Sequence, residues 1–235
     1  MAEIIPAILP KNWEELSLKL TTLARLREED NAIAEDVRVV QVDICDGVLT
    51  KHATWPYDNK DSGAHFQKIV NQQEGIPDWD VLDFEFDLMV EKPIEVVDEF
   101  ISAGALRLVF HDRALVGEDE FEKILEKVAG SCEVGVALNI GKGENFTKYK
   151  GKTDFVQCMG IRRLGFQGEE FSEEVLQTVE AIKKIDSEAV VSVDGGVTLE
   201  NARSLISAGA SRLVVGSAIW QSDDIIETIR SLNRL

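Results

Sequence analysis

Polar side chains stand at every second position near the ends of three apolar runs, and their types suit proton transfer or metal binding. The rows are Gln41 and Asp43 within VVQVDI (39–44), Asp83, Glu85 and Asp87 within DFEFDLM (83–89), and Ser192 and Asp194 within VVSVD (190–194). Since successive side chains of a strand point to opposite faces, each row shares one face and the apolar residues share the other. Carboxylates on a buried face are costly unless they are paired, protonated or bound to a cation. Three converging rows therefore predict a catalytic or metal-binding site.

A single row has a simpler interpretation, in which water and neighbouring polar groups satisfy its side chains near an open surface. Convergence of three rows favours a functional site instead. Asp43, Asp87 and Asp194 cannot all stay ionised side by side without a cation, so we expect at least one raised pKa among them. Asp46 and Gly47, just beyond the first row, are expected to shape a turn.

Glycine-rich turns give a second signal, which points to a bound anion. VDGGV (193–197) and VGSAIW (215–220) each follow an apolar run, and LGFQGEEF (164–171) follows another. Backbone amides in such turns, aimed from the start of a helix, bind phosphate groups. The predicted phosphate site comprises Gly168, Gly195, Gly196, Gly216 and Ser217. The simpler alternative is that these glycines are needed only for the geometry of the turns and bind no ligand.

These side chains need elements that bring them together, and the sequence alternates short β-branched runs with longer helix-period segments. Predicted strands span 3–9, 37–44, 81–90, 106–111, 133–139, 154–159, 189–194 and 211–216. The clearest predicted helices span 12–27, 93–103, 118–129, 172–185, 198–208 and 218–232. Asn12, Ser172 and Thr198 are the expected helix caps, and Ala-Gly-Ala at 103–105 and 208–210 marks two helix ends.

Eight strand–helix pairs favour a closed (β/α)8 TIM barrel, with an open doubly wound sheet as the alternative. We expect one domain over 1–235. In such a barrel, function lies at the carboxyl ends of the strands, and phosphate sites are often built after strands seven and eight. Both the acidic rows and the glycine turns fall at these places.

Composition narrows the classes of partner. The net charge of −18 is spread evenly, which disfavours nucleic acid and anionic membranes. No apolar stretch is long enough to span a bilayer, and the first residues lack the features of a secretory signal. The three cysteines, Cys45, Cys132 and Cys158, are widely spaced without a CxxC pair, so we expect a reduced, cytoplasmic protein. No dinucleotide fingerprint is present, and no nucleotide or organic cofactor is expected.

Short motifs along nearly the whole chain resemble the ribulose-phosphate 3-epimerases, a family of ribulose-phosphate-binding barrels. The matching stretches are IIPAIL (4–9), VDICDG (42–47), DLMVEKP (87–93), GVALN (135–139), GFQGEEF (165–171), VDGGV (193–197) and VGSAIW (215–220). The resemblance implies proton transfer at C3 of a ketopentose 5-phosphate through an enediolate, with Asp43 and Asp194 as the acid–base pair. It also implies a small phosphorylated sugar as ligand, a divalent metal and a homo-oligomer.

The chain departs from the family pattern at several site positions. Gln41 and Asp87 stand where the family has metal-binding histidines, and Ala7 stands where it has a serine. The tentative metal ligands Gln41, Asp43, Asp87 and Asp194 offer only oxygen atoms, which favours magnesium or manganese over zinc or iron. Arg162 and Arg163 replace an Asn-Pro pair.

These departures leave two alternatives to an active epimerase. One is a barrel that binds a sugar phosphate without turnover. The other is an enzyme with a different phosphorylated substrate, in which an arginine of the Arg162–Arg163 pair binds an extra anion; a solvated surface pair is the simpler interpretation. His111, at a strand end, is expected to be a hydrogen-bonded structural residue. The segment with His52, His65 and Trp55 is a candidate lid over the site.

Overall fold

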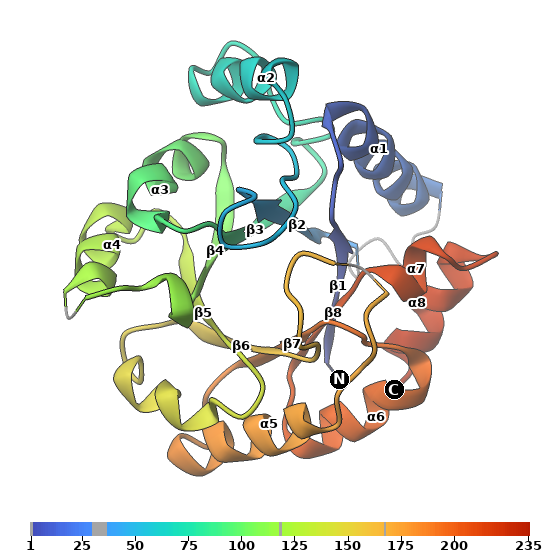
Figure 1. Ribbon diagram of the computed structural model, residues 1–235. Coiled ribbons are helices and arrows are strands. Elements are labelled where there is room, and N and C mark those ends of the chain that lie inside the picture. Colours follow the sequence, from blue (N-terminus) through green and yellow to red (C-terminus); the bar gives the residue numbers. More distant parts are fainter. Residues whose placement is uncertain (1, 30–36, 118, 167) are drawn as a thin grey trace.

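The fold is a closed barrel of eight parallel strands surrounded by helices. A computed structural model describes residues 2–29, 37–117, 119–166 and 168–235. The strands neighbour one another in sequence order, and β8 pairs with β1 to close the ring. Figure 1 looks along the barrel, with the strands at the centre and the helices outside. Closure decides for the (β/α)8 barrel over the open sheet.

The eight predicted strands are all present, with bounds that differ by one or two residues. They are β1 (Glu3–Ile8), β2 (Val39–Cys45), β3 (Asp83–Met89), β4 (Ala105–His111), β5 (Glu133–Leu138), β6 (Phe155–Met159), β7 (Val191–Asp194) and β8 (Arg212–Val215). The helices are α1 (Trp13–Glu29), α2 (Lys60–Val70), α3 (Pro93–Ser102), α4 (Glu120–Val128), α5 (Glu174–Ile185), α6 (Leu199–Ala208), α7 (Ser217–Trp220) and α8 (Ile225–Asn233), with short 3₁₀ turns η1 (Asp112–Ala114) and η2 (Gly143–Lys148). The helix predicted over 118–129 starts at a residue outside the described ones.

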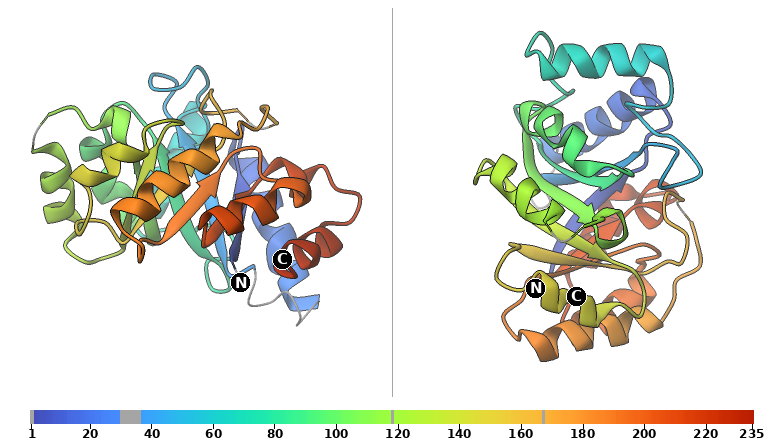
Figure 2. Two further views of the ribbon diagram at one scale, coloured as in Figure 1. Left: turned by 90° about the horizontal axis from the view of Figure 1, so that it is seen from below. Right: turned by 60° about the vertical axis from the view of Figure 1, so that its left-hand side comes forward.

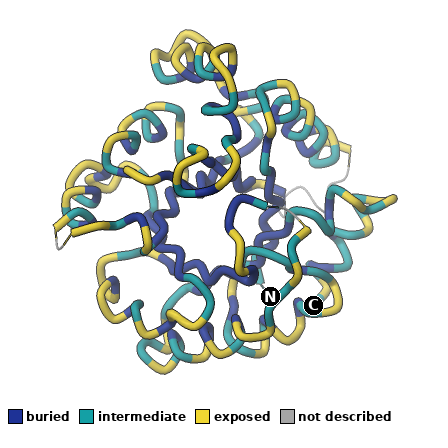
Figure 3. Tube along the Cα trace, viewed as in Figure 1, coloured by how far each residue is buried: buried dark blue, intermediate teal, exposed yellow. Residues whose placement is uncertain are grey.

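Strand alternation places the apolar and polar rows as predicted. Val40, Val42 and Ile44 of β2 belong to the large apolar cluster between the strands and the helices. Cys45 packs with Met89 and Met159 in a separate cluster of inward-facing residues. Figure 3 shows the ring of strands almost wholly buried, while exposed residues lie on the outer helices and loops. The inward faces therefore hold the polar rows that the sequence singled out.

Helix ends agree with the sequence in most places. The Asn12 side chain accepts a hydrogen bond from the Glu15 N–H at 2.9 Å, and the Asn201 side chain accepts one from the Thr198 N–H at 2.9 Å. Gly104 and Gly209 have φ of +91° and +117°, the left-handed conformation expected after a helix. The Ser172 cap is wrong, because the Val175 N–H bonds to the Ser172 carbonyl and α5 begins at Glu174.

The last predicted helix, 218–232, is two helices. Helix α7 ends at Trp220, and α8 begins after Asp224, whose side chain accepts a hydrogen bond from the Glu227 N–H at 2.9 Å. Ser222 also bonds to the backbone of Asp224. Short polar side chains that bond to nearby backbone favour caps over helix interiors, so this polar stretch starts a new helix.

The segment after β2 is mostly part of the barrel wall rather than a lid. Trp55 is fully buried in the core. His65 lies on α2, where its ring stacks on Trp13 with centroids 4.7 Å apart. A helix was expected after this strand, but its bounds were not predicted, because the sequence of α2, KDSGAHFQKIV, contains a glycine and few strong helix formers. The turn near His52, which packs edge-on to Phe166, lies near the loop after β6.

An ion-pair network closes the amino-terminal end of the barrel. Arg107 bonds to Glu3 at 3.2 Å, to Glu133 at 3.0 Å and to Glu85 at 3.5 Å. Arg212 reaches Glu3 at 3.0 Å. Burial raises the pKa of Glu85 to about 7 despite both arginines. This network lies near the starts of the strands, whereas the glycine turns follow the ends of the strands. Figure 2 shows the barrel from the side. Among the described residues, no helix is long and apolar enough to cross a membrane.

Candidate functional site

The three predicted aspartates meet inside the barrel. One carboxylate oxygen from each of Asp43, Asp87 and Asp194 lies within 4.8 Å of the other two. Asp43 and Asp87 are direct partners in the β2–β3 ladder, which puts both side chains on the inward face. Asp194 is the last residue of β7, so it reaches the same space from a distant strand. The convergence inferred from strand alternation is confirmed.

Gln41 binds two of these carboxylates. Its Nε2 donates to Asp43 Oδ1 at 2.7 Å and to Asp194 Oδ2 at 3.1 Å. The side chain is fully buried, and its Oε1 is a buried oxygen without a hydrogen-bond partner. An amide is therefore built into the cluster, with one of its two polar atoms unused.

Gln157 was missed by the sequence analysis. It is fully buried on β6, and its Nε2 donates to Asp87 Oδ2 at 3.2 Å and to Asp194 Oδ2 at 3.4 Å. Its Oε1 also lacks a partner. The signal was available, since FVQCM places Gln157 on the same strand face as Met159. Gln157 is the only polar side chain on that face of β6, and a single amide is a weaker signal than a row of carboxylates.

His111 also belongs to the cluster. Its Nε2 lies 2.7 Å from Asp87 Oδ1, and the side chain is 1% exposed. The expected hydrogen-bonded role is thus correct, with a site residue as the partner. Asp87 is held from β4 by His111 and from β6 by Gln157.

Burial and mutual repulsion raise the pKa of two of the acids. Desolvation raises the pKa of Asp43 well above its usual value, with further contributions from the charges of Asp194 and Asp87. Desolvation, followed by the charge of Asp87, raises the pKa of Asp194 to about 7. The expectation of at least one raised pKa is confirmed. The cluster can hold a protonated acid and an ionised base together near neutral pH.

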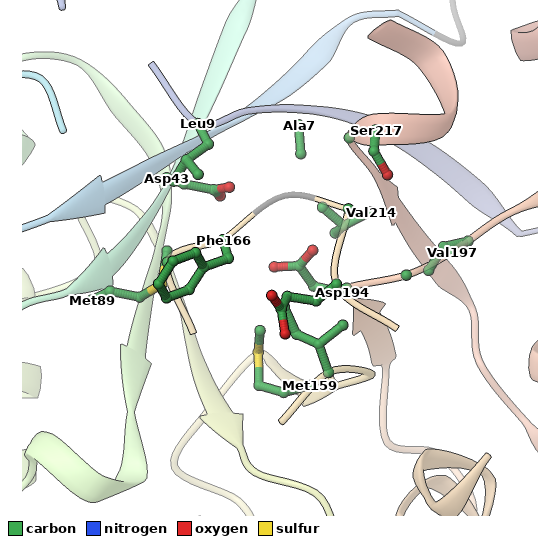
Figure 4. A pocket seen from close by; sticks show the side chains of 17 residues that line it. Ala7, Leu9, Asp43, Met89, Met159, Phe166, Asp194, Val197, Val214 and Ser217 are labelled. Carbon is green, nitrogen blue, oxygen red and sulfur yellow. The ribbon is translucent and has the colours of Figure 1, made fainter. Parts of the chain in front are cut away.

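The glycine turns line the same pocket as two of the acids. Figure 4 shows Asp43, Asp194 and Ser217 projecting into it beside Phe166. All five residues of the predicted phosphate site, namely Gly168, Gly195, Gly196, Gly216 and Ser217, line the pocket. Gly195 and Gly196 have φ of +102° and +69°. These conformations favour glycine.

The loop after β6 packs on this turn. A Cβ on Gly196 would lie 2.9 Å from Phe171 Cβ, and one on Gly195 would lie 2.8 Å from Ile161 Cγ1. Both contacts are closer than a Cβ tolerates, so glycine is required for the loop to sit there. Residue 167 of the predicted turn lies outside the described residues. The described part places Gly168, Glu169 and Phe166 in the pocket wall.

The two arginines of this loop are not among the residues that line the pocket. Arg162 bonds to Glu174 at 2.6 Å and Arg163 to Glu169 at 2.5 Å, with side chains 65% and 66% exposed. Arg163 also lies over the Phe166 ring, 5.1 Å from its centroid. The structure agrees with an exposed pair, and each guanidinium already has a carboxylate partner.

The cluster fits a divalent cation held by oxygen atoms. Three carboxylates lie together, and rotation of the neighbouring Gln41 amide, whose Oε1 has no hydrogen-bond partner, would add a fourth oxygen. Hard cations such as Mg²⁺ and Mn²⁺ prefer carboxylate and amide oxygens. His111 holds Asp87 as the outer hydrogen bonds of metal-binding carboxylates commonly do. The cluster could therefore hold a metal ion.

Comparison with known proteins gives a consistent picture. Residues 15–220 match the model of the "Ribulose-phosphate 3 epimerase family". Ribulose-phosphate 3-epimerase of Chlamydia trachomatis is 25% identical over 85% of this chain and 82% of its own length. The enzyme of the same name from Treponema pallidum is 26% identical over 97% of this chain and 94% of its length. That from Escherichia coli is 29% identical over 61% of this chain and 66% of its length.

Solved structures resemble the chain in fold. A 3-hexulose-6-phosphate synthase superposes with a TM-score of 0.65 at 18% identity, covering 100% of this chain and 99% of the other. A tryptophan synthase α-subunit from Pyrococcus furiosus has a TM-score of 0.65 at 15% identity, with 100% of both chains covered. At these identities the likeness concerns the barrel architecture alone.

Proposed function

The chain belongs to the ribulose-phosphate 3-epimerase family, and from that premise we propose that it epimerises a ketopentose 5-phosphate at C3. The observation that carries the proposal is the approach of Asp43 and Asp194 to one pocket from two different strands. Epimerisation removes a proton on one face of a carbon and returns one on the other, so it needs two proton-transfer groups on two sides.

The two aspartates divide the work by protonation state. An ionised carboxylate takes the C3 proton, the electron pair of the C–H bond moves into an enediolate, and a protonated carboxyl on the other side returns a proton to C3. The raised pKa values of Asp43 and Asp194 permit one acid and one base at neutral pH. The reverse reaction uses the same groups with their roles exchanged.

A divalent cation fits the same cluster. Gln41, Asp43, Asp87 and Asp194 would hold it, and it would supply positive charge to the oxygens of the enediolate. The oxygen-only set favours Mg²⁺ or Mn²⁺ over Zn²⁺ or Fe²⁺. In the structure, the Nε2 atoms of Gln41 and Gln157 donate hydrogen bonds to Asp194.

The phosphate group of the substrate is assigned to the glycine turns. Backbone amides around Gly195, Gly196, Gly216 and Ser217 line one side of the pocket, and Gly168 faces them from the loop after β6. Glycines let the phosphate approach the backbone closely. This end anchors the sugar so that C3 lies between the acids.

A coupled assay tests the proposal. Purified protein is treated with EDTA, reloaded separately with Mg²⁺, Mn²⁺ or Zn²⁺, and supplied with D-ribulose 5-phosphate. We expect D-xylulose 5-phosphate to form, with Mg²⁺ or Mn²⁺ giving the higher rate. Product formation by none of these preparations would contradict the proposal.

A second candidate is a barrel that binds sugar phosphates without turnover. The specific observation in its favour is that the Gln41 amide already bonds to both Asp43 and Asp194, which satisfies the acid–base pair with a group that cannot titrate. This protein would be stabilised by D-ribulose 5-phosphate in a thermal shift experiment, in the absence of metal, and would form no product.

A further inference from the structure

Two glutamines flank Asp194 in the same way. The Nε2 atoms of Gln41 and Gln157 lie 3.1 and 3.4 Å from one oxygen, Asp194 Oδ2. Each Nε2 also reaches one further acid, Asp43 for Gln41 and Asp87 for Gln157. The two amides, from β2 and β6, thus connect all three carboxylates.

Both amides leave the same atom unused. Gln41 Oε1 and Gln157 Oε1 are buried without a hydrogen-bond partner, although both side chains are 0% exposed. A buried polar atom without a partner is destabilising, so two of them on one cluster require an explanation. Ser192 Oγ is also buried without a partner, and it forms no hydrogen bond with the three acids.

Rotation of an amide group exchanges its two polar atoms within nearly the same volume. When the cluster holds no cation, the amide nitrogen must point at the carboxylates, because only N–H groups can bond to ionised oxygens. When the cluster holds a cation, the amide oxygen must point at the cation instead. Both unused oxygens thereby gain a partner, and the same two side chains serve the cluster with and without a cation.

We propose that Gln157 is, together with Gln41, an amide ligand of a divalent cation held by Asp43, Asp87 and Asp194, and that both amides rotate when the cation binds. Five oxygen-bearing side chains then surround the ion, with no nitrogen or sulfur donor among them. This donor set matches Mg²⁺, Mn²⁺ or Ca²⁺. The inference rests on the metal site of the proposed function and not on turnover.

Metal affinity, measured without substrate, tests it. Mn²⁺ binding to the EDTA-treated protein is followed by electron paramagnetic resonance for the parent, Gln157→Leu and Gln157→Glu. We expect Gln157→Leu to weaken binding by about 10- to 100-fold, as loss of a coordinating group does. Gln157→Glu keeps an oxygen donor and should bind at least as tightly as the parent. Gln157→His should shift preference toward Zn²⁺.

Ser192→Ala is the matched control. Ser192 is fully buried and is the partner of Gln157 in the β6–β7 ladder, yet its Oγ forms no hydrogen bond with a carboxylate of the cluster. Its removal changes a buried polar group at the same level of the barrel, and the Mn²⁺ affinity should stay within about twofold of the parent. A loss equal to that of Gln157→Leu would show a general packing effect and overturn the inference.

A measurement on the parent protein covers the case in which Gln157→Leu does not fold. With isotope-labelled glutamine, addition of Mg²⁺ should shift two side-chain amide pairs, identified through Gln157→Glu and Gln41→Glu. Unchanged amide resonances, or equal Mn²⁺ affinity in the parent and Gln157→Leu, would overturn the inference. A parent that binds Mn²⁺ through Gln157 but forms no product would instead contradict the proposed function alone.

Discussion

At the scale of single residues, the chemistry depends on burial. Burial of Asp43 and Asp194 in low-dielectric surroundings favours their neutral forms and raises the pKa of both. Hydrogen bonds from Gln41 act in the opposite direction on both Asp43 and Asp194. The balance raises the pKa of Asp194 to about 7 and that of Asp43 well above its usual value.

Replacement of either acid–base residue tests their assignment. Asp43→Asn and Asp194→Asn each remove a proton-transfer group while keeping the shape of the side chain. We expect kcat for D-ribulose 5-phosphate to fall by about 10²- to 10⁴-fold in each variant, with KM changed little. Steady-state kinetics with the preferred metal provide the measurement.

Asp46→Asn is the control for these variants. Asp46 accepts hydrogen bonds from the N–H groups of Val48 and Leu49 through Oδ1 and from that of Glu91 through Oδ2, and an asparagine oxygen keeps the first two. The variant should keep most of the parent rate. A loss as large as that of Asp43→Asn would refute the separation of a turn residue from a catalytic one.

At the scale of elements, the loop after β6 brings a negative charge to the proposed phosphate site. Glu169 lines the pocket, and the loop that carries it packs on Gly196. Arg163 binds Glu169 through two hydrogen bonds, at 2.9 and 2.5 Å. The arginine thus neutralises a carboxylate that would otherwise repel the phosphate.

Arg163→Ala should weaken the binding of D-ribulose 5-phosphate by about fivefold, since an unpaired charge near a phosphate costs about 1 kcal/mol in a solvated site. Adding Glu169→Gln should restore the affinity. Arg162→Ala is the matched control, because Arg162 forms a similar exposed pair with Glu174 outside the pocket lining. Titration calorimetry gives the affinities, and a loss that Glu169→Gln fails to restore would contradict a charge effect.

Features that follow from a regular strand were predicted from the sequence more fully than features that depend on helix caps or packing. Side chains of a strand alternate strictly between its two faces, so the sequence correctly placed Asp43, Asp87 and Asp194 on the inward face. The bounds of helix α2 and the break before Asp224 were missed, because side-chain capping and packing against the barrel override weak local preferences there. Gln157 was missed because a single amide in an otherwise apolar strand is a weaker signal than a row of carboxylates.

At the scale of the whole molecule, the barrel has the proposed catalytic site at one end and an ion-pair network at the other. The ion-pair network around Arg107 and Glu85, at the amino-terminal end of the barrel, joins strands β1, β3, β4, β5 and β8. Glu85 is fully buried, and its pKa of about 7 means that the folded protein holds this proton more tightly than the unfolded chain does. A proton held in this way makes stability depend on pH.

The direction of this dependence follows from the raised pKa. Stability from Glu85 is complete below its ordinary value of 4.5 and is lost as the pH rises through about 7. The loss is on the order of 3 kcal/mol. Glu85→Gln cannot ionise, so the parent should lose stability relative to this variant between pH 5 and pH 8. Urea unfolding with EDTA present measures the difference, and a constant difference across this range would contradict the raised pKa.

Incorporation of solvent deuterium tests most directly whether Asp43 and Asp194 transfer the proton at C3. D-ribulose 5-phosphate is incubated in heavy water with the parent protein and its preferred metal, and the sugar is analysed by NMR. The account predicts solvent deuterium at C3 of both the recovered substrate and its epimer, and none when both Asp43 and Asp194 are replaced by asparagine. Absence of deuterium at C3 with every divalent metal, or equal incorporation by the double variant, would contradict it.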